Sequence, residues 1–448
     1  MFKKILIANR SEIALRIIRA CNDLSIETVL VYSQADADSL PVTLADESYC
    51  IGPAPAAQSY LNIPAIMNVA LLSGAEAIHP GYGFLAENAY FADICKEHKI
   101  KFIGPSADTI RLMGDKATAK ETVDKIGVPT VPGSDGLIEN LEDARKLAAE
   151  MGYPVLIKAT AGGGGRGMRI ARSEDELEVC LNAASTEAQA AFGNGGVYLE
   201  KFIQNMRHIE FQIFADQFGN VVHLGERDCS IQRRHQKILE EALSPALNDT
   251  LRKEMGEAAI KIAKDIEFEG AGTIEFIFDL DTDKFYFMEM NTRIQVEHPV
   301  SEAITGKDLL AEQLRVASCE KLSFTQEDIK FNGHAIEFRI NAEDPSQGFR
   351  PSPGLVKEYI APGGIGIRVD SHCYAGYNMP PYYDSLLGKL IVHGSTREEA
   401  INRAKRALNE FGVEGVNTTI PLHLQILDDP TFLSGNITTK YLDNLLAK

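Results

Sequence analysis

Short apolar runs alternate with amphipathic stretches along the first part of the chain. Residues 4–8 form an apolar run that predicts a strand, and residues 12–24 place Ile13, Ile17 and Ala20 on one face of a predicted helix. Further strands are expected at residues 28–32, 77–79 and 101–103. Strands that alternate with helices predict a parallel α/β domain.

A second region begins near Met113, and its Pro/Gly-rich segment 127–133 predicts a hinge. A helix over 140–151 and a strand over 154–158 are expected next, followed by a glycine tract and then by strands at 196–200, 210–215, 221–224, 272–279 and 285–290. A third region starts near Gly333; it is rich in strands at first and is expected to end with a helix over 396–410.

Composition narrows the class of protein. A length of 448 residues favours about three domains. The net charge of −18 argues against non-specific binding to nucleic acid or to anionic membranes, but it permits a local nucleotide site. Seven scattered cysteines without a C-x-x-C pair favour a reducing compartment. No signal peptide or membrane span is evident, so we expect a cytoplasmic protein.

The glycine tract at residues 162–167 fits G-x-G-x-x-G, yet the dinucleotide fingerprint requires a helix after it. Residues 168–171 predict a strand instead, so the tract is expected at the tip of a hairpin that folds over phosphates. The alternative is a mobile surface loop. Taken alone, a strand lysine is more often a solvated charge, but Lys158 lies on the strand just before the tract and is therefore expected to contact a phosphate; Lys116 is a weaker candidate.

Two apolar strands each contain a carboxylate. Glu275 lies within the first strand, and Glu289, followed by Asn291, lies within the second. Carboxylates among apolar neighbours need a partner or a metal, and this set of oxygen ligands suits Mg²⁺. The alternative is an edge strand with its polar face in water.

Polar residues then continue with period two through Arg293, Gln295 and Glu297. If the chain stays extended, they share one face with Glu289 and Asn291. That face would offer metal ligands, then a site for a small anion at Arg293, with Glu297 beside it as a general base.

Residues 226–237 are dense in charged and amide side chains. Gln232, His235 and Lys237 could cradle a phosphate or an acyl phosphate, whereas the alternative is a solvated loop with internal ion pairs. We interpret Cys229 as structural, since neither a base nor an acceptor is implied beside it. A lone histidine such as His208 is more often structural too.

Taken together, these motifs resemble biotin carboxylase, the ATP-grasp component of biotin-dependent carboxylases, over essentially the whole chain. The resemblance rests on ANR at 8–10, HPGYGFLAEN at 79–88, MGDK at 113–116, GGGGRGM at 162–168, RDCSIQRRHQK at 227–237, EMNTRIQVEHP at 289–299 and RINAEDP at 339–345. It implies a three-domain α/β ATP-grasp fold. The parts would be a Rossmann-like domain over 1–113, an ATP-grasp domain over 114–330 with a lid at about 130–203, and a mixed α+β domain over 331–448.

The resemblance also implies roles for individual residues. Nucleotide phosphates would be bound by Lys116, Lys158, His208, Gln232, His235 and the glycines Gly163, Gly164 and Gly165, and adenine by Glu200, Lys201 and Ile203. Glu275, Glu289 and Asn291 would bind two Mg²⁺ or Mn²⁺ ions. Bicarbonate would be held by Lys237, Arg293, Gln295 and Val296, with Glu297 as its base. Arg339 would stabilise the biotin enolate, with Tyr82 and Gly83 near the ring.

The implied reaction begins with attack of bicarbonate on the γ-phosphoryl group of ATP. The product, carboxyphosphate, delivers CO₂ to N1 of biotin inside a closed lid. The chain has no Met-Lys-Met biotinylation motif, so we expect biotin on a separate carrier protein, a separate carboxyltransferase, and a homodimer of this chain. Acetyl-CoA carboxylase of fatty-acid synthesis is the expected parent complex; a pyruvate or other acyl-CoA carboxylase is the alternative.

Three departures from the family pattern stand out: Ser11 where glycine is frequent, Ala161 in the glycine tract, and Gly348-Phe349-Arg350. None removes a catalytic residue. Two rival functions stay open, namely another ATP-grasp ligase that joins a carboxylate to an amine, and a non-enzymatic nucleotide-binding regulator. A ligase of that kind would not need Arg339, Tyr82 or Glu297, and a regulator predicts loss of the acidic residues, which are all present. A dehydrogenase is disfavoured by the strand after Gly167.

Overall fold

The first sheet is parallel, as the alternating pattern predicts. The computed structural model describes residues 1–134, 136–138, 140–159, 168–192 and 195–447. Five strands pair in the order β3-β2-β1-β4-β5, and every pairing is parallel. Their bounds are β1 (Lys4–Ile7), β2 (Glu27–Ser33), β3 (Glu47–Gly52), β4 (Ala77–His79) and β5 (Lys101–Phe102).

Both faces of this sheet are buried under helices. Along β1, Ile5 and Ile7 enter one core, and Leu6 enters the other, as the two-residue period of a strand requires. The first core includes helices α1 (Ser11–Asp23) and α11 (Leu309–Ala317), and the second includes α3 (Ile63–Ser73) and α4 (Ala89–Glu97). The shorter helices of this region are α2 (Leu40–Leu44), α5 (Ala107–Gly114) and α6 (Lys116–Lys125).

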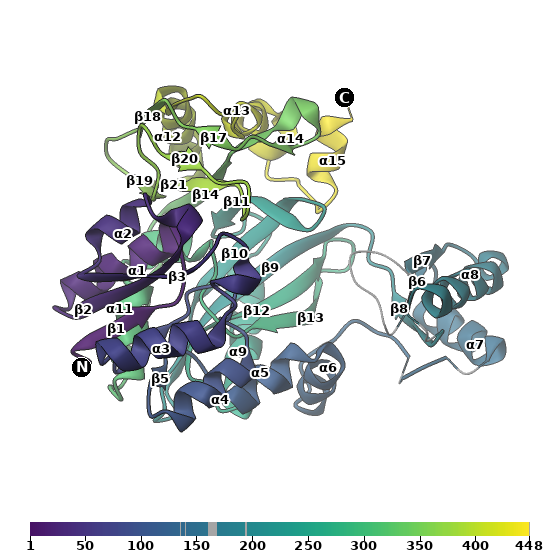
Figure 1. The fold of residues 1–448 in the computed structure, drawn as a ribbon. Helices are drawn as coiled ribbons and strands as arrows, with labels where there is room; N and C mark the ends of the chain where they lie inside the picture. Colours follow the sequence, from purple (N-terminus) through teal and green to yellow (C-terminus); the bar gives the residue numbers. More distant parts are fainter. Residues whose placement is uncertain (135, 139, 160–167, 193–194, 448) are drawn as a thin grey trace. The chain divides into compact units, whose positions relative to one another are not determined.

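The second sheet carries most of the predicted site residues. Eight strands lie in the order β13-β12-β9-β10-β11-β14-β21-β19 (Figure 1). Their bounds are β9 (Met206–Ala215), β10 (Val221–Arg233), β11 (Gln236–Ala242), β12 (Gly270–Asp279), β13 (Lys284–Asn291), β14 (His334–Asn341), β19 (Ile367–Ser371) and β21 (Leu386–Gly394). Helix α9 (Asp249–Asp265) packs on β10, and α10 (His298–Thr305) packs on β10, β11, β14 and β21.

The C-terminal region continues beyond the helix at which we expected it to end. Helix α12 (Arg397–Glu410) begins after Thr396, whose side chain caps it. It is followed by β22 (Gly412–Glu414), α13 (Ile420–Asp428), α14 (Pro430–Leu433) and α15 (Tyr441–Leu446). These helices are too short to show a clear periodicity, and they form because their apolar residues, such as Ile426 and Leu442, complete the core of α12. The region also contains strands of two or three residues: β15 (Glu343–Asp344), β16 (Arg350–Pro351), β17 (Gly354–Leu355), β18 (Glu358–Ile360) and β20 (Asn378–Met379).

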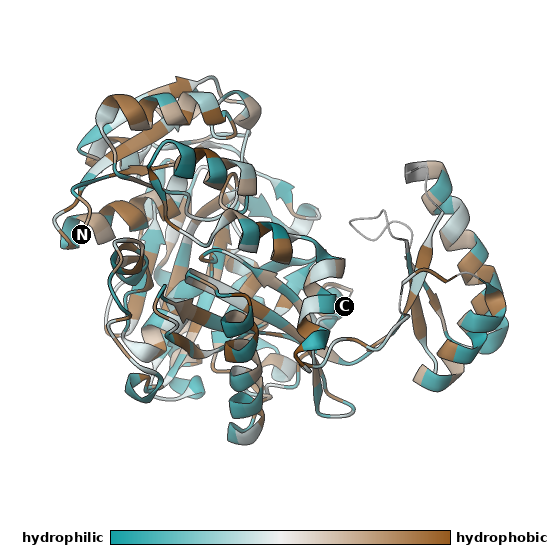
Figure 2. Ribbon diagram, turned by 90° about the horizontal axis from the view of Figure 1, so that it is seen from below, coloured by the Kyte–Doolittle hydropathy of each residue, from teal (hydrophilic) through white to brown (hydrophobic). Residues whose placement is uncertain are grey.

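A smaller compact unit comprises residues 127–206 and 277–288, and the rest of the described chain forms the larger unit. In the smaller unit, β6 (Val155–Ala159) pairs antiparallel with β7 (Met168–Ala171) and β8 (Val197–Lys201). Helices α7 (Leu141–Met151) and α8 (Glu174–Phe192) cover one face of these strands, which are strongly hydrophobic (Figure 2).

The β6–β7 pairing confirms that a strand follows the glycine tract, and this excludes the dinucleotide fingerprint. The tract itself, including Gly163, Gly164 and Gly165, lies outside the described residues, as does Ala161. The two compact units do not coincide with the three predicted domains at 1–113, 114–330 and 331–448. The division into three domains stays a prediction.

Two of the departures occur at residues with left-handed backbone. Ser11 has φ 63°, and Phe349 has φ 66°. Glycine adopts this conformation without steric cost, which explains why a glycine suits the first position, whereas serine there requires compensation. Ser11 Oγ lies 2.9 Å from Nδ1 of the buried His372, a contact that glycine could not make. Among the described helices, none combines the length and apolarity needed to cross a membrane.

Candidate active site

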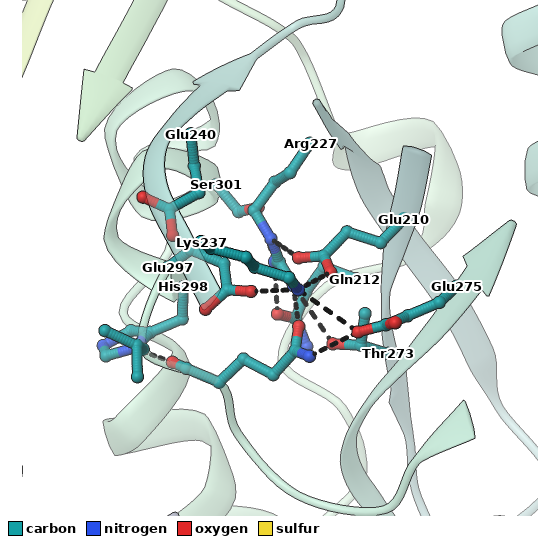
Figure 3. A network of polar contacts seen from close by, with 12 residues as sticks. Glu210, Gln212, Arg227, Lys237, Glu240, Thr273, Glu275, Glu297, His298 and Ser301 are labelled. Atoms are coloured by element: carbon teal, nitrogen blue, oxygen red, sulfur yellow. Dashed lines mark hydrogen bonds and ion pairs between the residues drawn. The ribbon is translucent and has the colours of Figure 1, made fainter. Parts of the chain in front are cut away.

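Lys237 lies at the centre of a buried group of carboxylates. Its Nζ is 2.5 Å from Glu210 Oε2, 3.2 Å from Glu275 Oε1 and 2.5 Å from Glu297 Oε1 (Figure 3). The three acids come from β9, from β12 and from the turn that precedes α10. One ammonium cannot balance three buried carboxylates, so a second cation is required.

Arg227 supplies that second charge. Its side chain is fully buried, and its five N–H groups are all used. Nε donates to Glu210 Oε1 at 2.5 Å. The remaining groups donate to the side-chain oxygens of Gln212, Ser301, Thr273 and Gln295 at 2.7–3.1 Å. The guanidinium therefore fixes both Gln295 and Glu210, and Glu210 is also a partner of Lys237.

Glu210 and Gln212 are site residues that the sequence motifs did not single out, and Arg227, although it lies in the motif at 227–237, was given no role there. A signal was nevertheless present, because His208, Glu210 and Gln212 alternate with apolar residues along β9. The two-residue period that drew attention to residues 289–297 would have placed these three side chains on one face as well.

Glu275 fits the role of a ligand for a hard divalent cation. It is 4% exposed, and its Oε1 accepts hydrogen bonds from Asn291 Nδ2 (2.8 Å) and Gln295 Nε2 (2.9 Å). Its Oε2 lies 3.0 Å from His208 Nε2. Burial opposes ionisation, but Lys237 and His208 hold the pKa of Glu275 well below its ordinary value. Asn291 presents its amide nitrogen to Glu275 and its oxygen to Arg293, so its amide would have to turn to give, with Glu275, the oxygen ligands that Mg²⁺ or Mn²⁺ prefers.

Glu289 lies on β13, the strand next to that of Glu275, as we predicted. Its Oε2 is 2.7 Å from Lys116 Nζ, and 32% of its side chain is exposed. The alternative prediction is an edge strand whose polar face is in water. It holds in part for Glu289, because β13 is an edge strand of the sheet and the side chain is partly exposed. It is wrong for Glu275, which is buried.

The prediction that the chain stays extended through Glu297 is wrong. Strand β13 ends at Asn291, and Glu297, with φ −81° and ψ 8°, precedes the first residue of α10. Pro299 sets the first turn of that helix, since its ring fixes a helical φ. The turn, rather than a shared strand face, brings Gln295 to Glu275 and Glu297 to Lys237.

Arg293 lies in this turn, and 21% of its side chain is exposed. Its Nε donates to Glu87 Oε2 at 2.9 Å, and its Nη2 donates to Asn291 Oδ1 at 3.0 Å. Glu87 belongs to the segment that precedes α4, and its Oε1 also accepts from the backbone N–H of Thr292 at 3.0 Å. Arg293 is therefore linked through Asn291 to Glu275, one of the carboxylates around Lys237. Its own ion pair is with Glu87, and no contact with Lys237 is found among the described residues.

Glu297 is a buried and ionised carboxylate. It is 2% exposed, and Lys237 Nζ and Arg339 Nη2 lie 2.5 and 3.1 Å from its two oxygens. Burial opposes the charge, but Lys237, Arg339 and Arg227 together hold the pKa of Glu297 below its ordinary range. Such a carboxylate becomes a stronger base when one of these cations turns to another anion.

Arg339 contacts a second buried carboxylate, Glu240, in addition to Glu297. Its Nε donates to Glu240 Oε1 at 2.7 Å, and its Nη2 lies 2.5 Å from the same oxygen. Because Glu297 and Glu240 occupy this edge of the guanidinium, its plane is fixed.

Tyr82 and Val296 are linked through a buried ion pair. The Tyr82 hydroxyl donates a short hydrogen bond to Glu12 Oε1, and Lys389 Nζ is 3.1 Å from that oxygen and 2.7 Å from the Val296 carbonyl. Gly83, which is exposed, follows with φ 68°. The structure thus brings a predicted biotin residue and a predicted bicarbonate residue to opposite ends of one chain of contacts.

The segment 226–237 is a hairpin rather than a solvated loop. Residues Glu226, Arg227, Asp228, Ser230 and Ile231 are buried, and their charges are matched inside the sheet. Gln232 pairs with Lys237 across the turn, where His235 has φ 65° and is exposed. Cys229 is buried, and burial raises the pKa of its thiol well above the ordinary value, as expected for a structural cysteine.

The predicted adenine residues and Lys158 lie in the smaller unit. Lys158 and Glu200, on neighbouring strands β6 and β8, form an ion pair, and Lys201 Nζ donates to the Gly152 carbonyl at 2.8 Å. Ile203 is buried. The remaining described candidates for nucleotide binding, including Lys116 and His208, lie in the larger unit.

Comparison with known proteins decides between the rival families. Family models match residues 1–110 (biotin carboxylase, N-terminal domain), 115–325 (carbamoyl-phosphate synthase L chain, ATP binding domain) and 337–444 (biotin carboxylase C-terminal domain). Biotin carboxylase 1 of Bacillus subtilis (strain 168) is 60% identical over 443 residues, which cover 99% of this chain and 98% of that protein. The chain belongs to the biotin carboxylase family. It is therefore an ATP-dependent carboxylase ligase with an ATP-grasp fold, and the resemblance seen in the motifs is confirmed.

Other members of the biotin carboxylase family match over similar lengths. A pyruvate carboxylase subunit of Methanothermobacter thermautotrophicus is 54% identical, over 99% of this chain and 90% of that protein. The bicarbonate-bound biotin carboxylase domain of a thermophilic 2-oxoglutarate carboxylase matches with a TM-score of 0.95 and 51% identity, over 100% and 99% of the two chains. A dimer of the domain from Hydrogenobacter thermophilus, in complex with MgADP, ADP and bicarbonate, matches with a TM-score of 0.90 and 53% identity, over 100% and 99%.

Proposed function

We propose that this biotin carboxylase carboxylates biotin on a separate carrier protein, with ATP and bicarbonate as co-substrates. The observation that carries the proposal is the position of Glu297, a buried carboxylate between the side chains of Lys237 and Arg339. A base placed between two cations suits an anionic substrate. Before the anion binds, the cations lower the pKa of the base, and they are also the groups that can bind the anion.

Bicarbonate binds at Lys237, Arg293, Gln295 and Val296 in this proposal. When Lys237 turns from Glu297 toward bicarbonate, the carboxylate loses its closest cation and its basicity rises. Glu297 then takes the bicarbonate proton, and a bicarbonate oxygen forms a bond to the γ-phosphorus of ATP while the bond to ADP breaks. The products of this step are carboxyphosphate and ADP, and the proton stays on Glu297.

The nucleotide is held by two groups of residues. Lys116, Lys158, His208, Gln232 and His235, together with Gly163, Gly164 and Gly165, contact its phosphates, and Glu200, Lys201 and Ile203 contact adenine. Glu275, Glu289 and Asn291 would hold two Mg²⁺ or Mn²⁺ ions, which neutralise charge on the phosphates when bound.

Biotin binds beside Tyr82 and Gly83. Carboxyphosphate breaks into CO₂ and phosphate, phosphate takes the proton from N1 of biotin, and N1 forms the new bond to CO₂. Arg339 stabilises the negative charge that develops on the ureido oxygen at this point. Its anchoring by Glu240 and Glu297 supports this role, because a fixed donor needs no reorganisation during the reaction.

We extend the proposal to the assembly. The chain forms a homodimer in the cytoplasm and works with a biotin carboxyl carrier protein and separate carboxyltransferase subunits, and its domains span 1–113, 114–330 and 331–448. The dimer of the Hydrogenobacter thermophilus domain supports the first point. Acetyl-CoA carboxylase is the proposed parent complex, and the similarity to one subunit of a pyruvate carboxylase marks pyruvate as the alternative acceptor.

Steady-state ATP hydrolysis tests the proposal. We expect hydrolysis to require bicarbonate and Mg²⁺, and free biotin to accelerate it. A carboxylate–amine ligase would respond to neither bicarbonate nor biotin, and a nucleotide-binding regulator would bind ATP without hydrolysing it. Hydrolysis that is independent of bicarbonate would refute the assignment.

A further inference from the structure

Helix α10 covers a charged face of the second sheet. On that face, Glu240 of β11 lies directly opposite Glu337 of β14, and Arg339 lies directly opposite Lys389 of β21. The apolar residues of the same face, among them Ala242 and Ala335, pack against α10. Side chains on paired strands that point to one face lie close together, so Glu240 and Glu337 are immediate neighbours.

Both carboxyl groups are fully buried, and only one is paired. Oxygen Oε1 of Glu240 accepts from Arg339. Within the described part of the chain, Glu240 Oε2 and both oxygens of Glu337 have no hydrogen-bond partner. Lys389, the other cation of this face, already contacts Glu12 and the Val296 carbonyl. Two adjacent buried carboxylates that share one guanidinium cannot both be ionised without a large cost.

The charged groups around the pair act on its ionisation in both directions. Arg339 on β14, Lys237 on β11 and Lys389 on β21 favour ionisation, whereas Glu297 at the start of α10 opposes it. Burial dominates for both acids. It raises the pKa of Glu240, and together with the neighbouring Glu240 it raises the pKa of Glu337 well above its ordinary value.

We propose that Glu240 and Glu337 hold one proton between them, and that the single negative charge left on the pair orients Arg339 toward biotin. Both would be positioning residues, and this proposal rests on the function proposed above for Arg339. With both acids ionised, Glu297 would be the third negative charge around the guanidinium instead of the second, and the added negative charge would oppose the anion that develops on biotin. With both neutral, Arg339 would lose its anchor.

Infrared difference spectroscopy of the full chain detects the shared proton directly. We expect a C=O absorption of a protonated carboxylic acid in the native protein at pH 8, and its loss in Glu337→Gln. In Glu240→Gln the band should disappear at a lower pH than in the native protein, because Glu337 then lacks an anionic neighbour while Arg339 still favours its ionisation. Glu241→Gln is the matched control. Glu241 lies next along β11, is buried, and pairs with Arg397 and His334, which hold the pKa of its carboxyl group at about 2, so this change should leave the band intact.

Thermal unfolding gives a second readout. A carboxyl group whose pKa is raised by folding destabilises the protein as the pH rises from its unfolded pKa toward its folded pKa. Glutamine removes that penalty, so Glu337→Gln should melt at a higher temperature than the native protein at pH 8, and the difference should shrink as the pH falls toward 5.

Kinetics separate positioning from a purely structural role. Glu240→Gln should lower kcat for biotin-stimulated ATP hydrolysis by about 10²-fold, since the amide oxygen can still accept from Arg339 but no longer holds it with a charge. It should leave the KM for ATP near the native value and change the biotin-independent hydrolysis much less. Equal loss in both activities would overturn the positioning role.

An unchanged acid band in Glu337→Gln would overturn the shared proton, whatever the activity. If instead the band behaves as expected while the native enzyme shows no response to biotin, the proton pair stands and the proposed function of the site fails. The two proposals can therefore fail separately.

Discussion

Glu297→Gln is expected to lower bicarbonate-dependent ATP hydrolysis by about 10²–10⁴-fold, the usual contribution of a general base. Glutamine has nearly the shape of glutamate, and its one amide oxygen can still accept from Lys237 or from Arg339, but it cannot take a proton. Nucleotide affinity should be retained, because Lys237 keeps its contacts to Glu210 and Glu275. The measurement is steady-state phosphate release at saturating bicarbonate, together with calorimetric titration of the nucleotide.

Glu302→Gln is the matched control for this substitution. Glu302 lies in α10 itself, is 6% exposed, and pairs with Arg16 and Arg368 instead of Lys237. Its loss should reduce thermal stability and leave the proton transfer intact. Near-native turnover in Glu297→Gln would remove Glu297 as the base.

Lys237→Met is expected to reduce both stability and activity. It leaves Glu210, Glu275 and Glu297 without their shared ammonium, although Arg227 still contacts Glu210. Removal of one partner from a buried ion pair costs about 3–5 kcal/mol of the free energy of unfolding. Bicarbonate-dependent hydrolysis should fall by about 10²-fold or more, since an anion-binding cation is lost as well.

The loss of stability in Lys237→Met should depend on pH. In the native protein the pKa values of Glu275 and Glu297 are lowered, so their contribution is present above the unfolded pKa of about 4.3 and is lost as the pH falls through the folded values. The gap in melting temperature between native protein and variant should thus be full at pH 7 and shrink below about pH 4.5.

Lys4→Met, which removes an ion pair with Glu47 at the rim of the first sheet, is the control for Lys237→Met, and it should change the melting temperature far less. A Lys237→Met protein as stable as the Lys4→Met protein at pH 7 would contradict the view that Lys237 balances the buried acids.

Much of this architecture could be predicted from the sequence, for reasons that are local. The strand at Met168–Ala171 and the helix capped by Thr396 follow from periodicity and capping, which depend on neighbouring residues. The placement of Glu275 and Glu289 on adjacent strands agrees with the prediction made from two carboxylates set in apolar runs.

The predictions that failed concern segments whose structure is set by contacts with residues distant in the sequence. The polar residues of segment 292–297 keep a period of two and so predict an extended chain, yet Pro299 starts a helix and the turn folds onto Lys237. The charged segment 226–237 permits interpretation as a solvated loop, because its matching partners, Glu210 and Gln295, lie outside it in the sequence. Burial of that kind is set by tertiary pairing and leaves no local signature.

The most direct test of the central claim follows the oxygen atoms of bicarbonate. If bicarbonate attacks the γ-phosphorus of ATP, then bicarbonate labelled with heavy oxygen must transfer one labelled oxygen to the phosphate that is released, and mass spectrometry of that phosphate will detect it. Phosphate whose new oxygen comes from water, while biotin still accelerates hydrolysis, would contradict the account.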